Sequence, residues 1–345
     1  ASERIFKVLD TEAEISDEGN KSALQIDGSI EFKDVWFAYI DENWILKNVS
    51  FKVEKGQTLA FVGATGAGKS SVINLIGRFY EYQKGDIKID DIPVRDYKLD
   101  ELRKVVGVVL QDVFLFSDSI LNNISLRNSE ISKDEIIEAS KAVGAHDFIS
   151  KLPGGYDFNV QERGGMLSSG QRQLIAFIRA YVYNPRILIL DEATSSVDTE
   201  TERLIQNAIN ILTKGRTSII IAHRLATIQK ADNIIVMDQG EIVEQDSALD
   251  IFKNPKHIYT KALINSKPSL DVRLQQLPTI DDYMNNTTLD AVVSSKERAQ
   301  KHNKRKDDNT EHTKNKKKNK KKKQKKAERI REYGIDLNRS NHDAA

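Results

Sequence analysis

Residues 63–70, Gly-Ala-Thr-Gly-Ala-Gly-Lys-Ser, have the types and spacing of a phosphate-binding loop. They match G-x-x-x-x-G-K-S/T, follow the apolar segment 58–62 and precede apolar residues at helical spacing over 72–76. Glycines let backbone N–H groups converge on phosphate oxygens, and a helix N-terminus favours the same anion. We expect Lys69 to reach the β- and γ-phosphates of a nucleotide and Ser70 to bind Mg²⁺. The residues expected to line the phosphates are Gly63, Thr65, Gly66, Ala67, Gly68, Lys69, Ser70 and Ser71.

Two carboxylates follow a second apolar run. Residues 187–190 are all apolar, and Asp191 and Glu192 come directly after them. Such a run predicts a central parallel strand that is buried on both faces, and its carboxyl end lies where open α/β sheets bind ligands. We predict that Asp191 holds Mg²⁺, directly or through water, and that Glu192 polarises the attacking water as a general base.

A second anion site is indicated at residues 167–171, Leu-Ser-Ser-Gly-Gln. A helical pattern begins at Gln171 and carries an apolar stripe at Leu174, Ile175 and Ile178. A helix N-terminus preceded by Ser and Gly favours anions. Since the chain already contains one phosphate-binding loop, this second site suggests a second nucleotide.

Taken together, these motifs resemble the nucleotide-binding domain of an exporter-type ABC transporter, over residues 1 to about 244. The resemblance implies that Tyr39 stacks on adenine and that Gln111 contacts Mg²⁺ or the γ-phosphate and senses the membrane domain. It also implies that Ser168 and Gly170 contact the γ-phosphate of the partner subunit's ATP, with Gln171 as a further nucleotide-binding residue of the signature. By the same resemblance, Asp198 lies in the loop that crosses the dimer interface, and His223 contacts the γ-phosphate. Two positions depart from the usual exporter pattern, Ser169 in the signature and Gln161 before it.

The resemblance further implies an ATPase that uses ATP and Mg²⁺ as one half of a head-to-tail dimer, with a second ABC ATPase domain that is identical or different. The expected partner is a transmembrane domain, which would place the chain at the cytoplasmic face of the cell membrane. The sequence has no cysteine and no apolar run of the roughly 20 residues needed to cross a bilayer. Residues 1–28 resemble the linker that follows the membrane domain of an exporter.

The last hundred residues change in character. Residues 245–283 resemble the C-terminal extension of dipeptide and oligopeptide importer ATPases, with Ile258 where those proteins usually have Pro. Residues 296–345 contain 19 Lys and Arg against 8 Asp and Glu, whereas residues 1–295 contain 33 against 43. We expect this basic tail to be disordered, and anionic lipid or nucleic acid would be its ligand if it has one.

We therefore predict an α/β fold: a P-loop ABC ATPase core with an N-terminal antiparallel β portion and a helical signature subdomain. The predicted organisation is a linker over 1–28, an ABC ATPase domain over 29–244, an extension over 245–295 and a Lys-rich tail over 296–345. The helical subdomain is expected over about 112–182. The function that these features favour is that of the ATP-hydrolysing motor domain of an exporter. The alternatives are the ATPase subunit of a peptide importer and a non-transport ABC ATPase that acts on nucleic acid.

Overall fold

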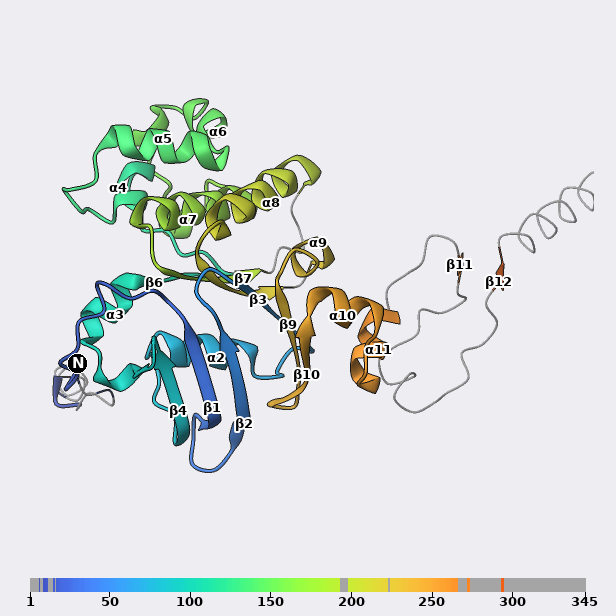
Figure 1. Ribbon diagram of the computed structural model, residues 1–345. Coiled ribbons are helices and arrows are strands. Elements are labelled where there is room, and N and C mark those ends of the chain that lie inside the picture. The colour runs from blue at the N-terminus through green and yellow to red at the C-terminus, as the bar shows by residue number, and fades with distance from the viewer. Residues whose placement is uncertain are drawn as a thin grey trace, which may run out of the picture. The chain divides into compact units, whose positions relative to one another are not determined.

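Two β-sheets form the framework of the protein, shown as a computed structural model in Figure 1. The structure describes residues 6, 9–11, 15, 17–192, 198–222, 224–265, 272–273 and 293–294. The chain divides into two units, Ala1–Lys261 and Ala262–Ala345. In the second unit, β11 (Val272–Arg273) pairs antiparallel with β12 (Val293–Ser294). All further elements belong to the first unit, apart from the end of its last helix.

The smaller sheet is antiparallel, in the order β2-β1-β4-β5. Its strands are β1 (Ile30–Ala38), β2 (Trp44–Val53), β4 (Lys84–Ile89) and β5 (Ile92–Pro93). In β1 the buried side chains switch from even to odd positions, from Ile30 and Phe32 to Val35 and Phe37. The register with β2 shifts at the same point, where Asp34 has a positive φ of 50°. This β-bulge lets one strand keep its apolar side chains on one face despite the break in alternation.

The larger sheet has the order β10-β9-β3-β8-β7-β6. Its strands are β3 (Thr58–Val62), β6 (Val106–Val109), β7 (Ile187–Glu192), β8 (Thr217–Ala222), β9 (Asn233–Asp238) and β10 (Glu241–Ser247). All neighbours are parallel except β10, which runs antiparallel to β9. Ile187 and Ile189 join the core shared with the smaller sheet, while the equally buried Leu188 belongs to the other face. The uninterrupted apolar run in β7 therefore serves two cores.

Helices cover both faces of the larger sheet (Figure 1). Helix α2 (Lys69–Ile76) contributes apolar residues to the core between the two sheets, and α3 (Leu99–Val105) leads into β6. On the other side lie α4 (Ile120–Ser125), α5 (Lys133–Val143), α6 (His146–Ser150), α7 (Ser169–Tyr183) and α8 (Thr199–Thr213), where α7 packs against α4, α5 and α8. The remaining helices are α9 (Leu225–Ile228), α10 (Ala248–Lys253) and α11 (Ile258–Asn265). Among the described residues, no helix is long and apolar enough to span a bilayer.

The predicted α/β fold class is confirmed: a mostly parallel core sheet carries an N-terminal antiparallel sheet and a group of helices that includes the signature segment. The predicted domain limits stay predictions. The first unit extends to Lys261, so that α10 and the first half of α11 lie within it, beyond the expected domain end at residue 244.

The segment that precedes β1 is fastened to the smaller sheet by one carboxylate. Asp90, at the end of β4, accepts hydrogen bonds from the backbone N–H groups of Asp27 (2.5 Å), Gly28 (3.0 Å) and Ser29 (2.8 Å). Burial alone would raise the pKa of Asp90, but these hydrogen bonds to the charged form together lower it.

Asp90→Asn should therefore lower the free energy of unfolding by about 1–2 kcal/mol at neutral pH, because hydrogen bonds to a charged acceptor are weakened. A lowered folded pKa gives stability that is present above the unfolded pKa of about 4 and is lost as the pH falls through the folded pKa. The deficit of the variant should thus shrink below about pH 4, as measured by urea unfolding. Asp91→Asn, at the exposed neighbouring position, is the matched control. A deficit that stays constant with pH would contradict the assignment.

Candidate active site

The carboxyl ends of four neighbouring strands meet at one edge of the larger sheet. In the parallel ladders, Phe61 is level with Ile221, Ile221 with Asp191, and Leu190 with Val109. The predicted site residues Gly63, Glu192 and Gln111 stand at or just after these strand ends. Their predicted roles stay predictions. The side chain of Glu192 and the whole of His223 lie outside the described residues, and Gln111 is exposed.

The phosphate-binding loop connects β3 to α2 through tightly constrained glycines. Gly63 has φ 149°, and a Cβ there would lie 2.1 Å from the carbonyl oxygen of Met237. Gly68 is the N-cap of α2 in the left-handed region (φ 100°), and no side chain caps the helix there. Backbone N–H groups at this end of α2 are therefore left for an anion rather than for a capping side chain.

Lys69 is a buried cation inside this loop. Its side chain is 7% exposed, and its ammonium donates hydrogen bonds to the carbonyl oxygens of Gly63 (2.9 Å) and Ala64 (2.8 Å). Burial lowers the pKa of Lys69, while the negative charge of Asp191 acts in the opposite direction. Asp191 at the end of β7 is thus close enough to influence the loop lysine. A buried cation held by carbonyl oxygens is suited to receive phosphate oxygens in their place.

Tyr39 lies beside the start of α2 and is 44% exposed. Its hydroxyl is 3.1 Å from the Ser71 hydroxyl and accepts a hydrogen bond from the Asn74 amide (3.2 Å). Its ring meets those of Phe37 and Tyr80 edge-on, with centroids 4.7 and 4.8 Å apart. The structure therefore presents an anchored aromatic ring next to the phosphate-binding loop. Ser71 itself is buried, so its hydroxyl serves Tyr39 here.

The signature segment forms the N-terminus of α7. Ser168 is the N-cap: its hydroxyl accepts from the Gln171 N–H (3.2 Å), and its own N–H donates to the Gln171 side chain (3.0 Å). Ser168 is exposed and Gly170 is buried. This capping box fixes the shape of the helix end that is predicted to contact a nucleotide. Helix α7 lies on the opposite side of the larger sheet from α2 (Figure 1).

Asp198 is the N-cap of α8, where its carboxylate accepts hydrogen bonds from the N–H groups of Glu200 (3.1 Å) and Thr201 (2.9 Å). These contacts, led by the one from Thr201, lower the pKa of Asp198 and keep it charged. The predicted role at a dimer interface stays a prediction, because a single chain does not test it.

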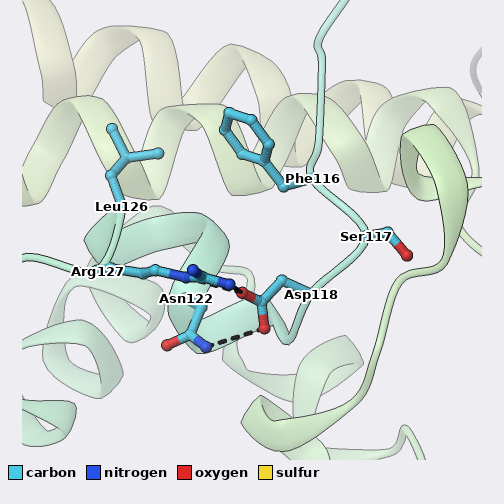
Figure 2. Close-up of a pocket in the computed structure, with 6 residues that line it drawn as sticks. All are labelled: Phe116, Ser117, Asp118, Asn122, Leu126 and Arg127. Carbon is cyan, nitrogen blue, oxygen red and sulfur yellow. Dashed lines mark hydrogen bonds and ion pairs between the residues drawn. The ribbon is translucent and has the colours of Figure 1, made fainter.

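Two features near the edge of the sheet were not predicted. The first is a pocket in the segment after Gln111, lined by Phe116, Ser117, Asp118, Asn122, Leu126 and Arg127 (Figure 2). The amide of Asn122, the guanidinium of Arg127 and the N–H of Ser119 all donate to Asp118 and hold its pKa at about 2. Exposed Leu110, Phe114 and Phe116 make this surface apolar. The close spacing of these three large apolar residues is the signal from which the sequence could have predicted this apolar surface.

The second unpredicted feature is a contact between α11 and the phosphate-binding loop. The hydroxyl of Tyr259 accepts a hydrogen bond from the backbone N–H of Ala64 at 2.9 Å. The two residues are 195 positions apart, and the local sequence around either one does not predict the contact.

Comparison with known proteins agrees with this geometry. Residues 46–195 match the ABC transporter family, and residues 243–291 match the oligopeptide/dipeptide transporter C-terminal region. The chain is 50% identical over 246 residues to an uncharacterized ABC transporter ATP-binding protein, YknV, of Bacillus subtilis, covering 71% of this chain and 41% of that protein. It is 49% identical over 247 residues to an ATP-dependent lipid A-core flippase of Haemophilus influenzae, covering 71% and 42%.

A solved structure shares the fold. A bacterial Atm1-family ABC exporter with ATP bound superimposes with a TM-score of 0.69 and 41% identity, over 74% of this chain and 45% of that one. The chain thus spans less than half the length of these relatives.

Lys69→Ala should weaken the binding of ATP by about 10- to 100-fold, because a hydrogen bond from a charged donor contributes about 1.5–3 kcal/mol. Isothermal titration with ATP in the presence of Mg²⁺ measures the affinity. Lys104→Ala removes an exposed lysine that pairs with Asp100 and should leave the affinity unchanged. If the Lys69 variant bound ATP as tightly as wild type, the assignment of this loop to the nucleotide site would be wrong.

Proposed function

This chain belongs to the ABC transporter ATP-binding family, and we propose that it is the ATP-hydrolysing motor domain of an exporter. Members of the family hydrolyse ATP to drive transport. The observation that carries the proposal is the phosphate-binding loop itself, in which the buried ammonium of Lys69 is held by the carbonyls of Gly63 and Ala64 at the N-terminus of α2, which no side chain caps. The experiment that tests it is the Glu192 substitution described below.

The residues present fit ATP. The glycine-lined loop leaves no room for a side chain at Gly63, and Lys69 supplies a buried cation. Its hydrogen bonds to two carbonyl oxygens are exchangeable for phosphate oxygens. The exposed ring of Tyr39 lies next to α2, where it would offer a stacking surface for adenine. The proposed binding set therefore consists of Tyr39, Gly63 and the residues from Thr65 to Ser71.

Catalysis would be carried by groups at the ends of the parallel strands. Mg²⁺ would be held by Ser70, Gln111 and Asp191, and when bound it would neutralise negative charge on the phosphate oxygens. Glu192 would accept a proton from the attacking water, and Lys69 and His223 would contact the γ-phosphate. The alignment of β7 with β6 and β8, and of β8 with β3, supports this arrangement, since it brings the ends of these four strands to one edge.

A second chain would complete the site. The N-terminus of α7, with Ser168, Gly170 and Gln171, belongs to the helical side of the larger sheet, whereas α2 belongs to the other (Figure 1). We infer that the signature acts on the ATP of a partner ATPase domain in a head-to-tail dimer, with Asp198 at the interface. An isologous pairing would use both signature helices at once.

Exporter function is favoured over the importer alternative. The relatives that match the ATPase region include a flippase and an exporter, whereas the importer-type similarity is confined to residues 243–291. The alternative of an ATPase that acts on nucleic acid rests on residues 296–345, which lie outside the described residues. Binding of anionic lipid or nucleic acid by this tail stays a prediction.

The proposed membrane partner would contact the pocket after Gln111. The pocket joins apolar side chains, Phe116 and Leu126, to a fixed charged pair, Asp118 and Arg127, on an exposed surface (Figure 2). It adjoins the segment that leads from Gln111, so that a cytoplasmic segment of a transmembrane domain seated there would be mechanically linked to the nucleotide site. Through this partner the chain would work at the cytoplasmic face of the membrane. Residues 1–28 would form the connection to it.

Glu192→Gln should reduce ATP hydrolysis by about 10²–10⁴-fold, because it removes the general base. Binding of ATP should persist, since the loop and Lys69 are unchanged, and the unhydrolysed nucleotide should increase the dimer fraction. Phosphate release, titration calorimetry and size-exclusion chromatography measure the three effects. Glu200→Gln, in the first turn of α8, is the control. Phosphate release by the Glu192 variant at the wild-type rate would refute the assignment.

A further inference from the structure

The peptide group between Gly63 and Ala64 is held at both of its edges. On one edge, the Gly63 carbonyl accepts a hydrogen bond from the Lys69 ammonium at 2.9 Å. On the other, the Ala64 N–H donates to the hydroxyl of Tyr259 at 2.9 Å. The carbonyl and the N–H of a trans peptide point in opposite directions, so Tyr259 and Lys69 pull on opposite sides of the same group. The orientation of this peptide therefore determines where the ammonium of Lys69 can sit.

This peptide needs an anchor from outside the loop. Close packing against Met237 admits only glycine at position 63, and the backbone freedom of a glycine leaves the orientation of the following peptide to its hydrogen bonds. The next carbonyl, of Ala64, accepts from Lys69 (2.8 Å) and from the Ala67 N–H (3.2 Å), which are both within the loop. The Tyr259 hydroxyl comes from another element, and the side chain is buried, with 4% exposed. It supplies a fixed reference point for the first turn of the loop.

Tyr259 is itself fixed to the larger sheet. The carboxylate of Glu244, in β10, accepts hydrogen bonds from the N–H groups of Lys256 (2.8 Å) and His257 (2.9 Å) at the start of α11. The Tyr259 N–H then donates to the imidazole of His257 at 3.2 Å. Glu244 thus fastens the two residues that lead into α11, the helix that carries Tyr259. All of these residues lie within the first structural unit.

We propose that Tyr259 is a positioning residue for the nucleotide site: its hydroxyl holds the Gly63–Ala64 peptide so that Lys69 is ready to receive phosphate oxygens. The proposal rests on the function proposed above and extends it to a residue outside the loop and outside the predicted ATPase limits. It gives α11, at the start of the region of importer-type similarity, a direct role in ATP binding. Without the hydroxyl, the Ala64 N–H loses its partner within the protein, and the peptide populates other orientations. Only a fraction of molecules then has the binding-competent loop, which weakens the apparent affinity.

The test compares Tyr259→Phe with Tyr97→Phe in the full chain. Each variant removes one hydroxyl from a buried ring, and the hydroxyl of Tyr97 donates to the Ile89 carbonyl at 2.9 Å, away from the loop. Titration with MgADP should show an affinity about three- to tenfold lower for Tyr259→Phe and unchanged within twofold for Tyr97→Phe. In steady-state hydrolysis, KM for ATP should rise by a similar factor while kcat stays within twofold, because saturating ATP restores the competent loop.

A second readout does not depend on hydrolysis. An amine-reactive reagent, followed by mass spectrometry, should label Lys69 faster in Tyr259→Phe than in Tyr97→Phe or wild type without nucleotide. MgADP should suppress the labelling in all three. Glu244→Gln weakens the two hydrogen bonds that fasten the residues before α11. It should also lower the MgADP affinity and speed the labelling of Lys69, but by a smaller factor than Tyr259→Phe.

The outcomes separate the two levels of the proposal. Wild-type chain that does not bind MgADP would overturn the proposed function and this inference with it. Wild-type binding together with equal affinity and equal Lys69 labelling for the two Tyr→Phe variants would overturn the inference alone. A lower affinity of Tyr259→Phe that simply follows its melting temperature, as it would for a structural residue, would also overturn it.

Discussion

The buried ammonium of Lys69 is the constraint around which the rest of the site is built. Removing a charge from water is costly unless hydrogen bonds replace the water, and here the carbonyls of Gly63 and Ala64 provide them. Those carbonyls can face Lys69 only while the loop keeps its shape. Gly63 keeps it by close packing against Met237, and the Ala64 N–H keeps it through Tyr259. A cation held ready by the protein's own carbonyls is a site already organised for phosphate.

The second constraint is the separation of the two anion sites by the larger sheet. The phosphate-binding loop opens α2 in the core between the sheets, while the signature opens α7 among the helices on the other side. Each helix end is stabilised in its own way, α2 without a side-chain cap and α7 with a capping box between Ser168 and Gln171. Under the proposed function, each of these helix ends would supply one half of a nucleotide site. Association of two chains would then bring the halves together into complete sites.

The sequence predicted what depends on local pattern. The loop, its flanking strand and helix, and the buried strand that ends at Glu192 all follow from residues that are neighbours in the chain, and the fold class followed from them. The β-bulge at Asp34, the pocket below Phe116 and the Tyr259 contact depend on tertiary structure instead. Tyr259 lies in the predicted extension, and its contact with Ala64 spans 195 residues, so that no local pattern predicts it. The roles predicted for Glu192 and His223 stay predictions, since the first side chain and the whole second residue lie outside the described residues.

Mixing two inactive variants tests the central claim, that loop and signature of different chains share one ATP, most directly. Ser168→Arg protein keeps Lys69, and Lys69→Ala protein keeps Ser168, so a heterodimer has one site with both halves intact and one with both damaged. The account predicts that the mixture regains ATP hydrolysis that neither variant shows alone, in proportion to the heterodimer formed. Heterodimers that form but hydrolyse no more ATP than the separate variants would contradict it, because loop and signature would then serve the nucleotide of a single chain.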